Sequence, residues 1–197
     1  MDKFIIQGGV PLRGEVTPSG NKNAALPLLA ATILTREPIT IHNLPDINDV
    51  RSMRELLESI GVKVTFLGDH SWEFQADDIQ VSGLDPELCS KIRASILLVG
   101  PIIARAGQLQ IPPPGGDVIG RRRVDTHILA LESLGANTEY DPVEKIFKFS
   151  TDGLHASDIL LDEASVTATE NAVMAAVCAE GTTILRNAAS EPHVQEL

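Results

Sequence analysis

The sequence has few aromatic residues, few cysteines and few basic residues. One tryptophan, one tyrosine and five phenylalanines stand among 197 residues, so the core must be built from leucine, isoleucine, valine and alanine. The 16 lysines and arginines are outnumbered by 27 aspartates and glutamates, which gives a net charge of −11. So acidic a surface repels nucleic acid and anionic membranes, and a small anionic ligand can bind only where positive groups gather locally.

Targeting, membrane and metal-binding signals are also missing. The first residues lack the apolar stretch of a signal peptide, and the longest nearly apolar runs, 24–34 and 96–104, are too short to span a bilayer. Cys89 and Cys178 lie far apart without a CxxC pattern, and we expect two buried, free thiols. The five histidines show no metal-ligand spacing. We therefore expect no metal site, no membrane insertion and a cytoplasmic protein.

An internal repeat organises the chain. Residues 57–64, LESIGVKV, recur 74 positions later as LESLGANT at 131–138. Each copy ends an amphipathic stretch with helical spacing, and its glycine, Gly61 or Gly135, stands where a left-handed C-cap is expected. Such a repeat decides the fold, because each unit must bury its apolar face against its neighbours.

Each repeated unit is predicted to run helix, strand, helix, strand, strand. The third unit stops at Leu197 inside what looks like the opening of a helix, and we expect a truncated repeat of a longer protein; a degenerate last repeat is the alternative. The predicted helix–strand pairs are 23–34 with 38–43, 93–104 with 108–111 and 169–179 with 182–187, and the predicted hairpins are 62–67 with 71–76 and 137–140 with 145–150.

Three segments concentrate residues that are suited to binding an anion. The turn 18–27, PSGNKNAALP, enters a helix whose N-terminal N–H groups favour an anion, and Lys22 adds a positive charge there. In the segment 110–127, three prolines and two glycines precede Asp117 and three consecutive arginines, a cluster that can clamp phosphate or carboxylate. The third segment, 161–171, passes from a strand into a helix with hydroxyl groups near the helix start.

The second unit repeats the basic helix start of the first. Arg93 opens its helix at the position that corresponds to Lys22 and Asn23 one unit earlier, which suggests that the helix starts converge on one anion. Each feature also has a plainer interpretation. The lysine can be solvated, the arginines can pair with nearby acids, and the hydroxyl groups can simply cap their helix.

Five ordered motifs, SGNKNAALPLLAA, RASILLVGP, PPPGGDVIGRRRVDTH, SVTATEN and AEGTTILRNAASEP, resemble those of the UDP-N-acetylglucosamine 1-carboxyvinyltransferase family. The resemblance runs from Phe4 to Leu197. It implies an α+β fold, the enolpyruvyl transferase fold, with repeated βαβαββ-type units about a pseudo-threefold axis. It also implies a domain at 21–197, with its third repeat truncated, and an N-terminal strand segment at 1–20 that packs with a missing C-terminal domain.

The resemblance implies a reaction and a set of site residues. The family transfers the enolpyruvyl group of phosphoenolpyruvate to UDP-N-acetylglucosamine and releases phosphate, the first committed step of peptidoglycan synthesis, without metal or organic cofactor. By position, Lys22, Arg93 and Arg122 resemble phosphoenolpyruvate ligands, and Asn23 resembles a contact to the sugar. The positions that resemble nucleotide-sugar contacts are Arg122, Arg123, Val124, Asp125, Thr126, Glu163, Ala164, Ser165 and Val166, and His127 matches a further active-site position.

Two positions depart from the usual family pattern. Asp117 stands where many members have cysteine, and the resemblance implies that Asp117, together with Lys22, is catalytic. Asp117 would act as the general acid, and fosfomycin, which alkylates that cysteine, would fail here. Arg123 stands where most members have proline. With its second half absent, the chain alone is expected to be inactive.

Two alternatives stay open from the sequence. The chain can be a 5-enolpyruvylshikimate-3-phosphate synthase-like transferase of the same fold, or a non-catalytic homologue that binds a UDP-sugar.

Overall fold

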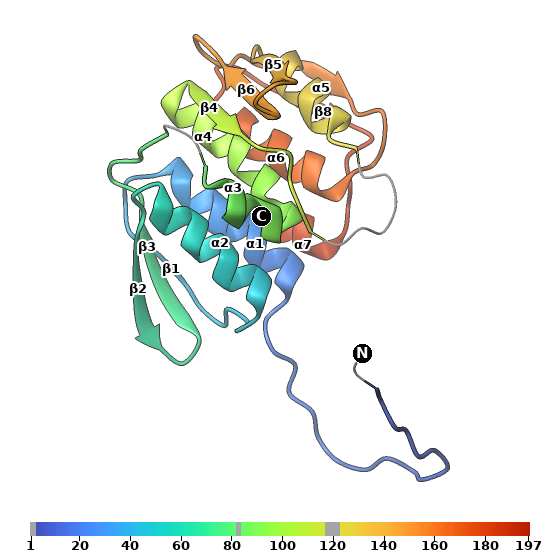
Figure 1. Ribbon diagram of the computed structural model, residues 1–197. Helices are drawn as coiled ribbons and strands as arrows, with labels where there is room; N and C mark the ends of the chain where they lie inside the picture. Colours follow the sequence, from blue (N-terminus) through green and yellow to red (C-terminus); the bar gives the residue numbers. More distant parts are fainter. Residues whose placement is uncertain (1–2, 82–83, 117–122) are drawn as a thin grey trace.

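The computed structural model describes residues 3–81, 84–116 and 123–197. Helices gather in the middle of the molecule and short sheets lie around them, and an N-terminal tail runs away from the body (Figure 1). The core is aliphatic, as the composition requires, and helices from different units contact one another within it.

The first unit follows the predicted order. It consists of α1 (Lys22–Ala31), the 3₁₀ helix η1 (Thr32–Leu34), β1 (Ile39–Ile41), α2 (Asn48–Ser59), β2 (Lys63–Gly68) and β3 (Ser71–Gln75). The strands form an antiparallel sheet in the order β1-β3-β2. The buried Phe74 stands in the central strand, opposite Ile39 on one side and Val64 on the other.

The second unit repeats this sheet. It consists of α3 (Pro86–Lys91), the 3₁₀ helix η2 (Arg93–Leu98), α4 (Val99–Ala106), β4 (Gln108–Ile111), α5 (Asp125–Ser133), β5 (Asn137–Asp141) and β6 (Ile146–Ser150). The order β4-β6-β5 matches that of the first sheet, and the buried Phe149 pairs with Leu109 and Thr138. Both predicted hairpins are confirmed.

The third unit is built around a parallel pair of strands. It contains β7 (Asp158–Leu160), α6 (Val166–Ala176), β8 (Ile184–Arg186) and α7 (Pro192–Glu196), and β7 pairs with β8 in parallel. The helix predicted to open near the C-terminus is α7. Figure 1 shows α6 in the middle of the molecule, where it contacts α1, η2, α4, α5 and α7.

The repeated glycines end their helices as predicted. Gly61 and Gly135 follow α2 and α5 with φ of +95° and +98°, the left-handed conformation that favours glycine. Each amide continues the cap by donating to a carbonyl of the last helical turn, that of Glu58 or Glu132. The matching caps confirm that the two sequence copies are copies of one structural unit.

Several elements differ from the prediction, and the helices differ most. The helix predicted at 93–104 is divided into η2 and α4, because Pro101 has no N–H to bond the carbonyl of Leu97 and the α-helical ladder starts later. The helix predicted at 169–179 begins at Val166, because Ser165 caps it by accepting from the amide of Ala168. α3 was not predicted, although Asp85 caps it and Pro86 opens it.

The cysteine prediction is half right. Both thiols are free. Cys89 is buried, and burial raises the pKa of its thiol to about 12. Cys178 is exposed, because it follows the last turn of α6 where the chain reaches the surface.

The described part of the N-terminal tail, residues 3–20, forms neither helix nor strand. Its apolar side chains lie in solvent, and Phe4, Ile5 and Leu12 are 94%, 97% and 98% exposed. The packing of this segment against a second domain stays a prediction.

Candidate functional site

A pocket of about 200 Å³ lies where the starts of α1, η2 and α6 come together. We name it the helix-start pocket. Lys22 and Asn23 line it from α1, Arg93 lines it from η2, and Val166 and Thr167 line it from α6. Each of the three units therefore contributes the first residues of a helix to one space.

Lys22 enters the pocket from a capped helix. Of the two cap candidates, Ser19 and Asn21, the structure selects Asn21, whose side-chain oxygen accepts from the amide of Asn23 at 2.7 Å. The Nζ of Lys22 lies 2.9 Å from Oδ2 of Asp49 on α2, and Asp49 also lines the pocket. An anion that enters here meets a cation already paired with a neighbouring acid.

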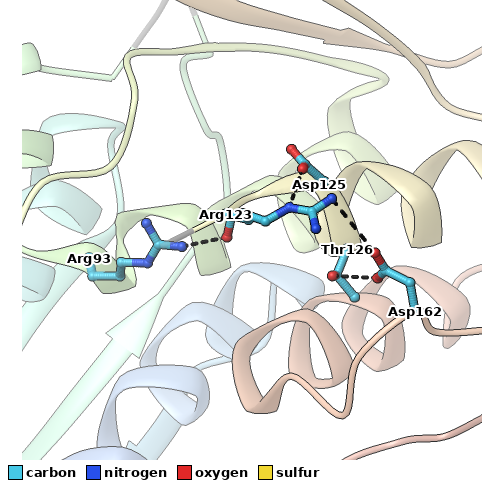
Figure 2. Close-up of polar contacts among 5 residues, drawn as sticks. All are labelled: Arg93, Arg123, Asp125, Thr126 and Asp162. Atoms are coloured by element: carbon cyan, nitrogen blue, oxygen red, sulfur yellow. Dashed lines mark hydrogen bonds and ion pairs between the residues drawn. The ribbon is translucent and has the colours of Figure 1, made fainter. Parts of the chain in front are cut away.

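Arg93 is positioned by the loop that follows β4. The amides of Gly115 and Gly116 donate to the carbonyls of Cys89 and Ser90 at 3.1 and 3.2 Å, which holds this loop against the turn before Arg93. A Cβ on Gly115 would stand 1.8 Å from the oxygen of Ser90, so only glycine permits the approach. Nη2 of Arg93 donates to the carbonyl of Arg123 at 2.6 Å (Figure 2).

A chain of polar contacts continues from Arg123 to the third unit (Figure 2). Nε of Arg123 lies 2.5 Å from Oδ2 of Asp125, and its Nη2 lies 4.0 Å from Oδ2 of Asp162. Thr126 donates from Oγ1 to Oδ1 of Asp162 at 2.6 Å. Arg123 therefore pairs with nearby acids in this structure, as the plainer of its two interpretations predicts. The contacts tie the start of α5, where Val124 precedes the first turn, to the segment before α6.

His127 belongs to a buried network under the pocket. It is 1% exposed, and its Nε2 lies 3.1 Å from Oγ1 of Thr167. Its Nδ1 lies 3.1 Å from Nδ2 of Asn171, whose amide also donates to the carbonyl of Ile96 at 3.0 Å and accepts from the amide of Gly100 at 2.6 Å. We name these five residues the junction.

The junction fixes the protonation of His127. Because the oxygen of Asn171 accepts from Gly100, its nitrogen faces Nδ1, which must be a bare acceptor, and the ring proton lies on Nε2. Burial, and secondarily the charge of Arg93, lowers the pKa of His127 to about 3. A neutral ring that donates to Thr167 can hold a pocket-lining hydroxyl in place.

The segment 163–166 is divided between surface and pocket. Ser165 caps α6, with its Oγ 3.4 Å from the amide of Ala168, and its own amide donates to the carbonyl of Glu163 at 2.8 Å. Val166 lines the pocket, whereas the side chains of Glu163 and Ala164 are exposed.

The remaining candidates, Asp117 and Arg122, lie outside the described residues.

The structure adds Glu170, which the sequence analysis missed. It is 1% exposed and lines the helix-start pocket, and its Oε1 has no hydrogen-bond partner among the described residues. Burial, and secondarily Glu191, raises the pKa of its carboxyl to about 7. A signal was available: Glu170 is the one charged residue in 166–176 and lies three and four positions after Thr167 and Val166, on the same helix face.

None of the helices in residues 3–81, 84–116 and 123–197 has the length and apolar run that a bilayer crossing needs. In those residues, no three histidine, cysteine or acidic side chains gather closely enough to hold a metal ion.

The sequence is similar to proteins of one family over nearly its whole length. The family model described as EPSP synthase (3-phosphoshikimate 1-carboxyvinyltransferase) matches residues 6–197. A UDP-N-acetylglucosamine 1-carboxyvinyltransferase from Bradyrhizobium diazoefficiens is 54% identical over 99% of this chain and 44% of its own length. One from Treponema denticola is also 54% identical, over 100% of this chain and 46% of its own length. The chain thus spans slightly less than half the length of these curated relatives.

Solved structures show the same fold at low identity. The enolpyruvyl transferase NikO from Streptomyces tendae superposes with a TM-score of 0.80 at 21% identity, over 96% of this chain and 44% of that one. An EPSP synthase from Acinetobacter baumannii gives 0.72 at 14% identity, over 92% of this chain and 42% of that one. The expected α+β enolpyruvyl transferase fold is confirmed. The chain belongs to the UDP-N-acetylglucosamine 1-carboxyvinyltransferase family of enolpyruvyl transferases and corresponds to the N-terminal half of its curated relatives.

Proposed function

We propose that the full-length protein transfers the enolpyruvyl group of phosphoenolpyruvate to a hydroxyl of UDP-N-acetylglucosamine and releases phosphate, as a step of peptidoglycan synthesis. The observation that carries the proposal is the helix-start pocket, where Lys22, Asn23 and Arg93 meet in a chain 54% identical to relatives named for this reaction. Phosphoenolpyruvate carries a phosphate and a carboxylate. A protein with a net charge of −11 needs such a local group of cations to bind it.

The cations of the pocket would bind phosphoenolpyruvate. Lys22 and Arg93 reach one space from two helix starts, and the free N–H groups at the start of α1 add a positive field. Charge-assisted hydrogen bonds from these groups would also stabilise the negative charge that develops on the departing phosphate. Arg122, which lies outside the described residues, completes the proposed set.

The nucleotide-sugar would lie against the starts of α5 and α6. Asn23, at the pocket, is the proposed contact to the reacting sugar. The contacts drawn in Figure 2 hold the first turn of α5 against the segment before α6, which supports a shared binding edge. The proposed contacts on this edge are Arg122, Arg123, Val124, Asp125, Thr126, Glu163, Ala164, Ser165 and Val166, with His127 as a positioning residue beneath them.

The chemistry requires an acid that protonates the methylene carbon, and we assign it to Asp117. An aspartate has an ordinary pKa near 3.9, so closure over the substrates must exclude water and raise it. Asp117→Asn is expected to abolish turnover in the full-length protein, because an amide cannot supply the proton. Asp117→Cys is expected to retain activity and to create sensitivity to fosfomycin, which the parent protein lacks. A fully active Asp117→Asn variant would remove Asp117 from the mechanism.

The proposal is tested by incubating the full-length protein with both substrates and measuring phosphate release and the carboxyvinyl product. Omission of either substrate is the control. Transfer to shikimate 3-phosphate instead would favour the 5-enolpyruvylshikimate-3-phosphate synthase alternative, and UDP-sugar binding without turnover would favour the non-catalytic one. Residues 1–197 alone are expected to show no transfer, because the other face of the site is missing and water enters the cleft.

A further inference from the structure

We propose that Glu170, held as a neutral carboxylic acid, is a ligand of the anion in the helix-start pocket, so that anion affinity falls as pH rises through neutrality. The inference deepens the proposed function and rests on it, because it takes the phosphate or carboxylate of phosphoenolpyruvate as the anion. It concerns a buried carboxyl group in a pocket that Lys22, Arg93 and the exposed Asp49 also line.

The geometry of Glu170 carries the inference. Its side chain is 1% exposed, yet it lines the same pocket as Lys22 and Arg93. Its Oε1 is buried without a hydrogen-bond partner among the described residues. A buried polar atom without a partner is unfavourable, and folded proteins rarely retain one unless a ligand or another group satisfies it. Because Glu170 lines the pocket, an anion bound there is the partner available to its carboxyl.

Among the described residues, the cations that line the pocket are Lys22, Arg93 and, on α3, Lys91. Lys22, the charged residue of α1, pairs with Asp49 at 2.9 Å. Arg93, the charged residue of η2, donates to the carbonyl of Arg123 at 2.6 Å. None of the three cations contributes to the pKa of Glu170.

The other helices that contact α6 do not supply a counter-charge either. From α5, His127 is neutral and Asp125 pairs with Arg123, while Glu132 is exposed. The only charged residue of α4, Arg105, bonds the carbonyls of Ile33, Thr35 and Asp77. α7 carries His193 and Glu196, and its N-cap residue, Glu191, acts on Glu170 and disfavours its ionisation.

These surroundings favour the protonated form of Glu170. Burial and Glu191 together raise the pKa of its carboxyl to about 7, in agreement with the geometry. A protonated carboxyl has an O–H that can donate to an oxygen of a bound anion, whereas an ionised one repels the anion. Anion binding above neutral pH must therefore draw one proton onto Glu170, and affinity must fall as that proton becomes harder to obtain.

The test compares the full-length parent protein with Glu170→Gln, whose amide is neutral at every pH and keeps a donor in the same place. Glu180→Gln is the matched control, because it makes the same change at an exposed position beyond the far end of α6. The affinity for phosphoenolpyruvate is measured by titration calorimetry from pH 6 to 8.5, with and without UDP-N-acetylglucosamine. Two buffers of different ionisation enthalpy give the number of protons taken up.

The dissociation constant of the parent for phosphoenolpyruvate, divided by that of Glu170→Gln, is expected to rise from near 1 at pH 6 to about 10 at pH 8. The parent and Glu180→Gln are expected to take up about one proton more than Glu170→Gln at pH 8. Inorganic phosphate and pyruvate, titrated separately, identify which group of phosphoenolpyruvate Glu170 contacts, because only the contacting group shows the same ratio.

Two failures are distinguishable. If Glu170→Gln has the same pH dependence as the parent, the inference is wrong although the transfer reaction stands. If the parent neither binds phosphoenolpyruvate nor transfers it, the proposed function is wrong. Should Glu170→Gln not fold, the proton count of the parent at pH 8 still decides, because binding without proton uptake contradicts the inference.

Discussion

Two polar regions meet at α6, and their buried side chains differ in whether their polar atoms are hydrogen-bonded. In the junction, each polar group of the Asn171 side chain has a partner, and the partners come from η2, α4 and α5. In the helix-start pocket, the residue just before Asn171, Glu170, keeps a buried oxygen with no partner among the described residues. Both side chains are at most 1% exposed. Burial alone therefore does not distinguish the two side chains, whereas their hydrogen bonds do.

The difference has an energetic meaning. A fully bonded buried amide stabilises the native arrangement and makes its neighbours depend on it. A carboxyl with an unmatched oxygen costs free energy that a ligand can recover, and it resists ionisation. We expect substitutions in the junction to destabilise the protein and the substitution of Glu170 to stabilise it.

The largest expected effect comes from breaking the junction. Asn171→Leu would leave the Gly100 amide and Nδ1 of His127 without partners and would remove one of the two donors to the Ile96 carbonyl, and we expect a loss of about 3 to 5 kcal/mol in unfolding free energy. Urea denaturation at pH 7 measures it. Asn137→Leu, at an exposed position on β5, is the control and should change stability by about 0.5 kcal/mol or less. Equal losses in the two variants would contradict the role of the junction.

The next effect has the opposite sign. The folded-state pKa of Glu170, about 7, lies above its unfolded value, so the protein loses stability as pH rises from about 4.5 to 7. Glu170→Gln removes this loss, and we expect it to exceed the parent in unfolding free energy by up to about 3 kcal/mol at pH 8 and by little at pH 4. Denaturation of both proteins across this range measures the difference. A variant less stable than the parent at pH 8 would show that the ionised carboxyl has a partner.

The two regions also differ in how much of each could be predicted from the sequence. Local patterns were enough for the repeated unit, because Gly61 and Gly135 mark their helix ends and alternating apolar residues mark the hairpins. Because Lys22 and Arg93 stand at equivalent helix starts, the sequence predicted that both contact one anion, and the structure brings them to one pocket. Such features repeat, and a repeat can be seen in one sequence.

What the sequence did not reveal depends on contacts between units. Glu170 looked like an ordinary helical residue, since its missing partner is a property of the packing of α6 against its neighbours. The bond from Arg93 to the carbonyl of Arg123 joins residues 30 positions apart through a backbone atom, which no side-chain pattern encodes. The division of η2 from α4 could have been predicted from Pro101, but the continuous apolar run around it has the pattern of a single helix.

A smaller effect is expected where the pocket is bounded by backbone. Gly115→Ala places a methyl group against the oxygen of Ser90, and the loop must move away from the turn that precedes Arg93. We expect a loss of about 1 to 3 kcal/mol in stability, together with weaker binding of phosphoenolpyruvate because Arg93 shifts. Gly8→Ala is the control, since no atom lies near its added methyl group. Unchanged affinity in Gly115→Ala would show that this loop does not position Arg93.

The smallest effect on stability, and the sharpest separation of stability from binding, is expected at Lys22. Its ion pair with Asp49 is short, at 2.9 Å, but the two side chains are 48% and 39% exposed. Exposed pairs of this kind contribute about 1 kcal/mol or less, so Lys22→Gln and Asp49→Asn should both unfold almost as the parent does, and salt should shrink the difference further.

The effects of the two substitutions on phosphoenolpyruvate binding should diverge. Lys22→Gln removes a cation from the pocket and should weaken binding at least tenfold, whereas Asp49→Asn frees the same cation from its competitor and should leave binding equal or stronger. Calorimetric titration of both variants measures this, and equal weakening would mean that the ion pair itself, rather than the charge of Lys22, shapes the pocket.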